Sequence, residues 1–357
     1  MHVAAPAPNV RHLAPLAPLT TLRLGGSAQT LIEVHDTEQA VTAVRQATAG
    51  KTPVLVLAGG SNVVISDAGF AGTVVLLRSA GITILDEDEH QVRLRVAAGH
   101  ELDDLVAWCV MRDYAGVECL SGIPGSVGAT PIQNVGAYGQ EIAEVIESVV
   151  AYDRDRDIVT EFAPADCGFG YRTSVFKRSR RDVVLEVVLR LRRDARATPP
   201  RYGELSRRLN YTREQRPLMT EVRAAVLALR SGKGMVIDAS DPDTRSVGSF
   251  FTNPIVPAAQ FGRLADALGK PRDQIPHWDI PDGGIKLAAA WLIEQAGFTK
   301  GYRVAGVGIS AKHTLALVNY SGTTAQLLDL ARQIRREVSC RYGVELEHEP
   351  VLVGEQL

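Results

Sequence analysis

The sequence predicts a mixed α/β protein of two or more domains, and three observations support this. The chain has 357 residues, which is long for a single hydrophobic core. Its content of 45% hydrophobic and 22% charged residues is ordinary for a globular protein. Apolar runs of strand length alternate with segments whose apolar residues recur at helical spacing. No internal repeat is evident, so a solenoid is not expected.

The N-terminal part of the chain predicts an α/β region. Residues 21–28 predict a short strand that ends in a glycine turn, and residues 36–50 predict a helix with a capping-box start and a glycine end. Residues 53–58 are entirely apolar, which predicts a strand buried within a sheet. Further strands are expected at 63–66, 73–77 and 92–97, with a helix at 101–112.

The segment 192–202 is the best linker candidate, because it combines prolines with charged residues. It predicts a first domain of residues 1–195, with two lobes that divide near residue 80, and a second domain of residues 196–357. Strands are expected at 145–152, 183–191 and 314–319, and helices at 220–230, 284–296 and 324–342.

The stretch from Cys119 to Gly139 is unlike the rest of the chain. It contains five glycines and two prolines among small and amide side chains, and it has no helical or strand period. Such an apolar loop is costly at the surface, because its peptide groups need partners. Two interpretations follow. The loop lies against a flat ligand with polar edges, or it is a tight structural crossover.

Composition excludes several classes of protein. The net charge of −2 gives no general attraction to nucleic acid or to a membrane surface. The basic run at 177–181 lacks interleaved aromatic residues, so a solvated turn is the simpler interpretation. Four scattered cysteines and eight histidines without ligand spacing predict neither a disulfide framework nor a metal site. Without an export signal or an apolar segment of membrane-spanning length, the protein is expected to be cytoplasmic.

A phosphate-binding loop is predicted at Gly59-Gly60-Ser61-Asn62, directly after an apolar strand. Successive N–H groups with a hydroxyl and an amide can hold a pyrophosphate without a basic side chain. The loop lacks the lysine of a Walker motif, and a strand follows it instead of the helix that a Rossmann fingerprint needs. The GxGxxA pattern at 306–311 is rejected for the same reason, since residues 313–319 alternate as a strand.

Seven motifs in register carry a resemblance to a known family. Together they are similar to the UDP-N-acetylenolpyruvoylglucosamine reductase family, and they span nearly the whole chain. The motifs are LGGSA at 24–28, LAGGSNVVISDAGFAGTVV at 57–75, GIPGSVGATPIQNVGAYGQEI at 122–142, FGYRTSVFK at 169–177, GSFFTNP at 248–254, KLAAAWLIEQAG at 286–297 and EHEPVLVG at 347–354.

The resemblance implies a VAO/PCMH-type FAD-binding domain of two α/β lobes, followed by a smaller α+β substrate-binding domain whose last residues return to the active site. It implies FAD as cofactor, NADPH as co-substrate and UDP-N-acetylglucosamine enolpyruvate as substrate, with no obligate protein partner. The product would be UDP-N-acetylmuramate, a peptidoglycan precursor. The cofactor-binding residues that it implies are Gly59, Gly60, Ser61, Asn62, Gly122, Ile123, Pro124, Gly125, Gly128, Gln133 and Asn134.

The implied reaction needs a cation and an acid. Hydride arriving at C3 of the enolpyruvyl group leaves negative charge at C2 and on the carboxylate. By the resemblance, Arg172 holds that charge with a forked guanidinium, Ser249 delivers the proton to C2, and Glu349 acts as a proton relay with a raised pKa. From the residues alone, a surface ion pair is the alternative for Arg172, which its aromatic, glycine-flanked run disfavours. Ser249 would be a cap or turn serine, and Glu349 one acid among Glu345, Glu347 and Glu349.

The substrate-binding residues implied by the motifs are Tyr171, Tyr202, Lys233, Asn253 and Gln295, with Lys286 and His313 as secondary neighbours. Lys233 would meet phosphate as a point charge, and Tyr202 would donate a hydroxyl. One departure concerns the segment 254–283, where the family usually has a tyrosine before a PDG-like turn and this chain has Trp278. An indole has no hydroxyl, so the contact of this lid with substrate is expected to change.

Two other functions remain to be separated from this one. An FAD oxidase of alcohols or hydroxy acids would share the two glycine loops but would have no need for Ser249 or Lys233. A nucleotide-binding protein with a decayed site would have no need for the intact set of Arg172, Ser249 and Glu349.

Overall fold

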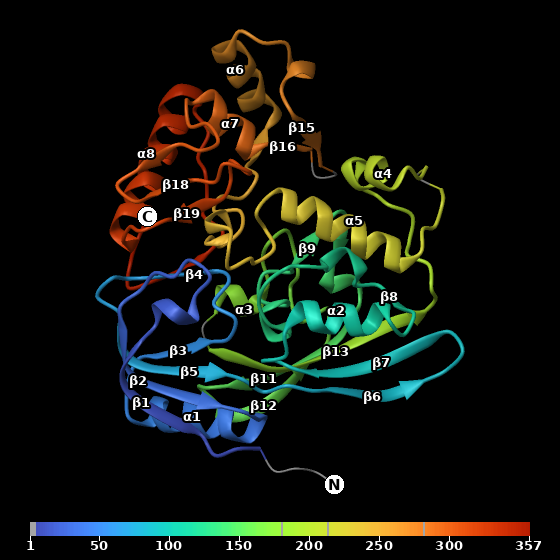
Figure 1. The fold of residues 1–357 in the computed structure, drawn as a ribbon, viewed down its shortest axis with the longest axis vertical. Helices are drawn as coiled ribbons and strands as arrows, with labels where there is room; N and C mark the ends of the chain where they lie inside the picture. Colours follow the sequence, from blue (N-terminus) through green and yellow to red (C-terminus); the bar gives the residue numbers. More distant parts are fainter. Residues whose placement is uncertain (1–4, 180, 213, 281–282) are drawn as a thin grey trace. The chain divides into compact units, whose positions relative to one another are not determined.

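The computed structural model describes residues 5–179, 181–212, 214–280 and 283–357 (Figure 1). These residues form two units, each with its own hydrophobic core. The first unit runs to Ala14 and continues with Ala28–Gly60 and Phe70–Ser231, and the second contains Pro15–Ser27, Ser61–Gly69 and Gly232–Leu357. The first unit thus extends past residue 195. The predicted domains of residues 1–195 and 196–357, and the two lobes that divide near residue 80, stay a prediction.

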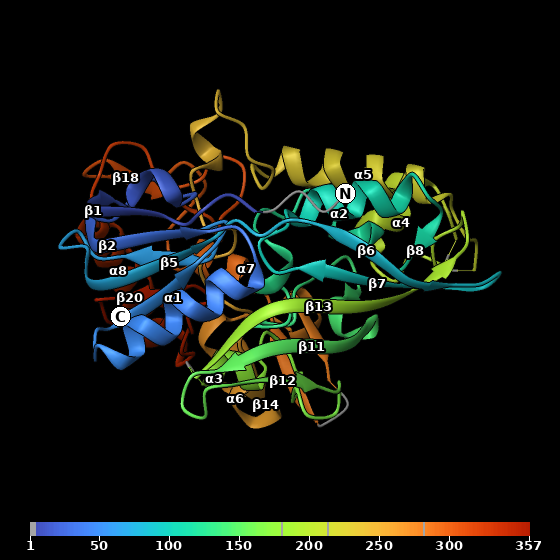
Figure 2. The same ribbon diagram turned by 90° about the horizontal axis from the view of Figure 1, so that it is seen from below.

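A four-stranded sheet begins the first unit. Its order is β1 (Asn9–Pro15), β2 (Ser27–Val34), β5 (Phe70–Leu77) and β3 (Val54–Leu57), and β5 pairs in parallel with both β2 and β3. Helix α1 (Thr37–Ala49) covers one face, as Figure 2 shows. The predicted helix start is confirmed, because the Asp36 carboxylate accepts a hydrogen bond from the Gln39 N–H at 2.7 Å.

Two predictions for this region are wrong. Residues 21–26 form a turn and irregular backbone instead of a strand, with Gly25 at a φ of +116° that only glycine adopts easily. The apolar strand β3 lies at the end of the sheet and is mostly half-buried. Its apolar residues pack against the core beneath α1, so an apolar run did not require a central position.

An antiparallel sheet forms the rest of the first unit. Its order is β12 (Ile158–Phe162), β11 (Ile146–Asp153), β13 (Asp182–Arg193), β7 (Gln91–Ala97) and β6 (Ile82–Glu87), and β8 (Tyr114–Ala115) also pairs with β13. Figure 1 shows helix α2 (Leu102–Val110) over this sheet, with α5 (Met219–Gly232) next to α2. The shorter elements are α3 (Val175–Arg178), α4 (Gly203–Leu209), η2 (Glu118–Leu120), η3 (Val127–Ala129), η4 (Ile142–Glu144), β9 (Gly136–Ala137) and β10 (Gln140–Glu141).

The predicted linker at 192–202 is not a free segment. Strand β13 runs to Arg193, and Ala197 beyond it is buried. The Ala197 N–H donates to the Pro217 carbonyl, and the Met219 N–H donates to the Ala195 carbonyl, both at 2.9 Å. These main-chain partners fix the segment against the residues that lead into α5.

The second unit contains small sheets packed with helices α6 (Ala258–Leu268), α7 (Ala289–Gln295) and α8 (Thr324–Tyr342). The predicted bounds of α8 are confirmed, whereas the predicted helix at 284–296 is a strand followed by a shorter helix. Main-chain pairing with residues 255–257 takes residues 284–286 into a sheet. The remaining elements are β4 (Val63–Ile65) with β20 (Val351–Val353); β14 (Ile255–Pro257), β16 (Gly284–Leu287) and β15 (His277–Asp279); β17 (Arg303–Val304), β18 (Val307–Ile309) and β19 (Leu317–Asn319); and η1 (Ala17–Leu19), η5 (Pro242–Thr244) and η6 (Arg272–Gln274).

Both units mix helices with sheets, so the predicted mixed α/β class is confirmed. None of the helices within the described residues has the length and apolar character that crossing a bilayer requires.

Candidate active site

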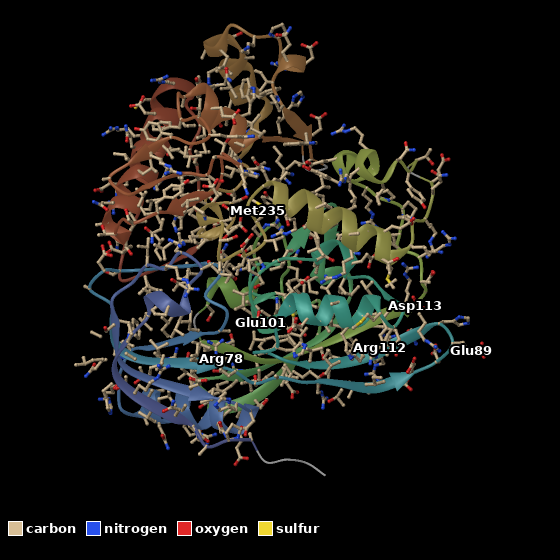
Figure 3. All side chains as sticks on the ribbon, viewed as in Figure 1. Arg78, Glu89, Glu101, Arg112, Asp113 and Met235 are labelled. Carbon is tan, nitrogen blue, oxygen red and sulfur yellow. The ribbon has the colours of Figure 1, made fainter. Side chains whose placement is uncertain are left out.

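The glycine-rich stretch at 119–139 is fixed by the start of helix α2. The Leu102 N–H donates to the Gly125 carbonyl at 2.9 Å, and the Asp103 carboxylate accepts from the Gly122 N–H at 2.6 Å. Glu101, labelled beside the start of α2 in Figure 3, pairs with Ser126 through an isolated antiparallel β-bridge of the backbone. The helix therefore holds both ends of the turn from Gly122 to Gly125.

The two predicted cofactor loops meet at a pair of glycines. A Cβ atom built on Gly59 would lie 2.6 Å from the Gly125 Cα atom, a distance that real side chains do not reach. Neither loop therefore leaves room for a side chain at Gly59. The apposition brings the end of strand β3 against the glycine-rich stretch, as expected if both loops serve one ligand.

The polar groups of this stretch divide into two sets. The Gly128 N–H donates to the Ala98 carbonyl at 2.8 Å, and the Asn134 side chain bonds Glu141, Gly170 and Ala143. These predicted cofactor-binding groups bond within the protein, as the Gly122 N–H does. The Ser126 hydroxyl, in contrast, is buried and has no hydrogen-bond partner among the described residues. A buried hydroxyl without a partner suits a polar atom of a bound cofactor, so these loops fit FAD.

Arg172 is tied to the glycine-rich stretch through its guanidinium. Its Nη2 donates to the Gly136 carbonyl at 2.8 Å and its Nη1 donates to the Asn134 carbonyl at 3.3 Å. Its backbone has a φ of 54°, and Asn134 and Tyr138 also have positive φ. Non-glycine residues in this conformation are uncommon and concentrate at functional sites, where surrounding contacts hold them.

Aromatic side chains accompany Arg172 in the first unit. The guanidinium carbon of Arg172 lies 5.5 Å from the centre of the Tyr171 ring, a predicted substrate-binding residue. The Tyr202 ring meets the Tyr138 ring edge to face at 5.8 Å. Burial raises the pKa of Tyr138 to about 12, so this hydroxyl stays protonated as a donor. Tyr138 was not among the predicted site residues, although it lies in the glycine-flanked run 136–139.

The backbone segments that carry Ser249 and Glu349 are joined in the second unit. The Glu349 N–H donates to the Phe250 carbonyl at 2.9 Å, and Phe251 forms a bridge with His348. Phe250 and Phe251 are buried, which anchors the backbone beside the half-buried Ser249. The structure also separates the three candidate acids, since Glu345 and Glu347 are exposed whereas Glu349 is half-buried.

The second half of the phosphate-binding loop adjoins Glu349. Strands β4 and β20 pair in parallel, and the Val351 N–H donates to the Asn62 carbonyl at 3.0 Å. Residues almost 290 positions apart in the sequence are therefore brought to the same end of one strand pair. The Asn62 carbonyl thus accepts a hydrogen bond from a residue that lies two positions after Glu349, the predicted proton relay.

The predicted substrate-binding residues of the second unit do not all lie together. The Asn253 side chain accepts from the Ala289 N–H at 3.0 Å, at the start of α7, whereas Gln295 is exposed at the end of that helix. The two are separated by the length of α7, about 9 Å at 1.5 Å per residue.

His313, expected only as a secondary neighbour, is linked through Leu315 to Phe250, the residue that follows Ser249. Its Nδ1 accepts from the Leu315 N–H at 3.0 Å, and the Leu315 carbonyl accepts from the Phe250 N–H at 2.8 Å. With Nδ1 as an acceptor, a neutral His313 ring carries its proton on Nε2 and can donate from it.

The segment that carries Lys233 is also packed in place. A Cβ atom on the following residue, Gly234, would lie 3.3 Å from the Asp243 carbonyl oxygen. The buried Asp243 carboxylate in turn accepts from the Tyr320 hydroxyl at 2.6 Å and the Ala311 N–H at 3.1 Å. These bonds hold Asp243, which lies against Gly234, to the turn that carries His313.

Trp278 lies on strand β15 and is paired with Lys286 of β16. Its side chain is exposed, at 46%. Pro281 and Asp282, which belong to the predicted PDG turn, lie outside the described residues.

Two segments of the chain match models of known protein families. Residues 28–160 match the model of an FAD binding domain, and residues 241–353 match the C-terminal domain of UDP-N-acetylenolpyruvoylglucosamine reductase. Helix α5 lies between the two matched segments.

Curated relatives match over nearly their whole length. The reductase of Salinispora arenicola is 53% identical over 346 residues, which cover 95% of this chain and 94% of the relative. That of Thermobifida fusca is 50% identical, covering 95% and 97%, and that of Mycobacterium tuberculosis is 47% identical, covering 97% and 96%.

A solved structure supports the fold. The crystal structure of UDP-N-acetylenolpyruvylglucosamine reductase from Thermus caldophilus has a TM-score of 0.67 at 24% sequence identity, covering 97% of this chain and all of that one. The resemblance predicted from the seven motifs is therefore confirmed. The chain belongs to the family of UDP-N-acetylenolpyruvoylglucosamine reductases and is an FAD-dependent oxidoreductase of peptidoglycan synthesis.

Proposed function

We propose that this protein reduces UDP-N-acetylglucosamine enolpyruvate to UDP-N-acetylmuramate with NADPH, and that Ser249, Arg172 and Glu349 carry the second half of the reaction. The observation that supports this proposal is the hydrogen bond from the Glu349 N–H to the carbonyl of Phe250, the residue that follows the half-buried Ser249. Both residues lie within or next to motifs of the reductase family. Because the substrates are charged nucleotides, we place the protein in the cytoplasm.

FAD, when bound, supplies the transfer of hydride from NADPH to C3 of the enolpyruvyl group. The chain must then meet the charge that develops at C2 and on the carboxylate. Arg172 has the chemistry for this, since a guanidinium stays ionised and binds a carboxylate with two parallel hydrogen bonds. Its Nη1 and Nη2 donate to the carbonyls of Asn134 and Gly136, which hold the guanidinium in position.

Ser249 delivers the proton to C2 in this proposal. A serine hydroxyl is a very weak acid, so it protonates only a strongly basic carbon and needs polar neighbours. Glu349 and the Nε2–H of His313 are the candidate neighbours, because both residues belong to the backbone network around Phe250. Glu349 would replenish the serine proton, which requires the carboxyl group to be protonated at that step.

FAD is assigned to the loops of the first unit and to the adjoining Ser61 and Asn62. The close approach of Gly59 and Gly125 and the buried Ser126 hydroxyl support this assignment. We assign the diphosphate of the substrate to Lys233, and Tyr202 would donate its hydroxyl to the substrate, as the motifs imply. Asn253 completes the set as a side chain held at the start of α7.

The test separates the two half-reactions by stopped-flow absorbance of the flavin. In Ser249→Ala, NADPH should reduce the flavin at the wild-type rate, while reoxidation by the enolpyruvyl nucleotide should slow by at least about 10²-fold. Ser240→Ala is the matched control, because Ser240 is exposed and its hydroxyl donates to the carboxylate of nearby Asp238 at 2.6 Å. An equal loss in both half-reactions would make Ser249 a structural residue.

The same preparation distinguishes the alternative flavin oxidase. Wild-type protein should be yellow, and its flavin should be reoxidised by the enolpyruvyl nucleotide. If the oxidised flavin instead bleached on addition of an alcohol or a hydroxy acid, the proposed substrate would be wrong.

A further inference from the structure

Asp103 joins three parts of the first unit. It lies in the first turn of α2, and its Oδ1 accepts from the Gly122 N–H of the glycine-rich stretch at 2.6 Å. Arg223 of α5 approaches the same carboxylate with both ends of its fork, Nη1 to Oδ1 at 2.6 Å and Nη2 to Oδ2 at 2.9 Å. Bidentate pairs of this kind are the strongest and most directional that side chains make.

Helix α5 presents a second cation to Asp103. Arg230 lies seven residues after Arg223, which places both on the same face of the helix. Arg223, the Gly122 N–H and Arg230 together hold the pKa of Asp103 below its usual value against the opposing effect of burial. The carboxylate is therefore ionised at neutral pH. Tyr138 also interacts electrostatically with Arg230.

The turn that Asp103 holds is the one that meets the phosphate-binding loop. Gly122 has a φ of +70°, and Gly125, three residues later, has a φ of +117° and lies against Gly59. Leu102 donates to the Gly125 carbonyl, so one turn of α2 grips both ends of this segment. Backbone at positive φ has several alternatives in a glycine and stays in one only when its surroundings select it.

We propose that Asp103 is a positioning residue for the cofactor: its ionised carboxylate, fixed by the fork of Arg223, holds the turn from Gly122 to Gly125 in the conformation that binds FAD. Helix α5 thereby belongs functionally to the cofactor site, although it lies outside both segments that match the family models. This inference rests on the proposed placement of FAD on the glycine loops.

The consequence is specific to cofactor binding. An amide at position 103 keeps an oxygen that accepts from the Gly122 N–H, but it loses the negative charge that attracts the guanidinium groups of Arg223 and Arg230. Loss of Arg223 keeps the Gly122 bond but frees the carboxylate to rotate. Both changes therefore loosen the turn while the hydrophobic core stays intact.

The experiment measures FAD binding to the apoprotein by quenching of flavin fluorescence. Asp103→Asn should raise the Kd for FAD by about tenfold and Arg223→Gln by about threefold to tenfold, since one charge-assisted contact is removed. The double variant should bind no more weakly than Asp103→Asn, because the two residues act as one unit. Hydrogen exchange of the peptide spanning residues 119–126 should accelerate in both single variants.

The matched control is the ion pair between Arg45 and Asp157, which joins two other elements of the first unit at 2.7 Å and is exposed on both sides. Arg45→Gln should change neither the Kd nor the exchange of that peptide. If the Arg223→Gln variant bound FAD as tightly as the wild type, the proposal would be overturned. This outcome counts even if the Asp103→Asn variant failed to fold. A fall in melting temperature without a change in Kd would also overturn it. Wild-type apoprotein that takes up no FAD would instead refute the proposed function.

Discussion

The two units hold their candidate site residues by different means. In the first unit, Arg172 and Tyr138 have strained positive φ angles, and side chains such as Asp103 and Asn134 bond the loop backbone around them. In the second, neither Ser249 nor Glu349 has a positive φ, and main-chain bonds between extended segments over buried phenylalanines set their positions. The first arrangement depends on individual polar side chains, and the second depends on the core beneath it.

The largest expected effect is on the core of the second unit. Phe250→Ala removes a fully buried ring that contacts Phe251 edge to face at 5.1 Å. It should lower the free energy of unfolding by about 3–5 kcal/mol, measured by urea denaturation. Ile237→Ala, at a side chain that is 56% exposed, is the control and should change stability by less than about 0.5 kcal/mol.

The next prediction changes a single polar group of the first unit. Arg172→Lys keeps the positive charge but cannot reach the carbonyls of Asn134 and Gly136 as a fork. Flavin reoxidation by the enolpyruvyl nucleotide should slow by about 10²-fold, with unfolding by urea nearly unchanged. If reoxidation kept its rate, point charge alone would suffice at this position.

A third substitution tests the contact between the two glycine loops. Gly59→Ala forces a Cβ atom to within 2.6 Å of Gly125, so one loop must move. We expect a loss of about 1–3 kcal/mol in stability and weaker FAD binding, measured by urea denaturation and by fluorescence titration. Gly232→Ala is the matched control, because no atom of the described residues outside its own helix would lie within 4 Å of the added Cβ atom.

The smallest effect is expected from pH. The pKa of Asp103 is lowered in the folded state, so its contribution to stability is present above the ordinary value of 3.8 and is lost as pH falls below it. The urea midpoint of wild type should therefore decline below about pH 4 more steeply than that of Asp103→Asn. Parallel pH profiles for the two proteins would contradict the role of this ionised group in the first unit.

Much of the fold could be predicted where local signals are strong. The capping residue Asp36, the glycine that follows the first helix and the long apolar period of α8 each predicted an element that the structure confirms. Residues 284–287 were predicted as helix because their apolar spacing continues into α7. Their pairing with β14 is set by residues about 30 positions away, which no local period reveals.

The site shows the same limit. Motifs identified Ser249 and Glu349, and the structure joins their backbone segments through the Phe250 carbonyl. The sequence could not show that the Asn134 side chain donates hydrogen bonds to Glu141 and Gly170. It also could not show that Asn253 bonds the start of α7, at the opposite end of that helix from Gln295. Asp103 was missed because its partners, Gly122 and Arg223, are 19 and 120 residues away.

The pairing of β20 with β4 has a consequence for synthesis of the protein. Val351 pairs with Val63 from almost 290 positions further along the chain, so strand β4 must wait for a partner that is synthesised much later. Closing so long a loop carries an entropic cost and makes this pairing a late event. The segment that carries Glu349, the proposed proton relay, is therefore seated late in folding, and until then the proposed catalytic set is incomplete.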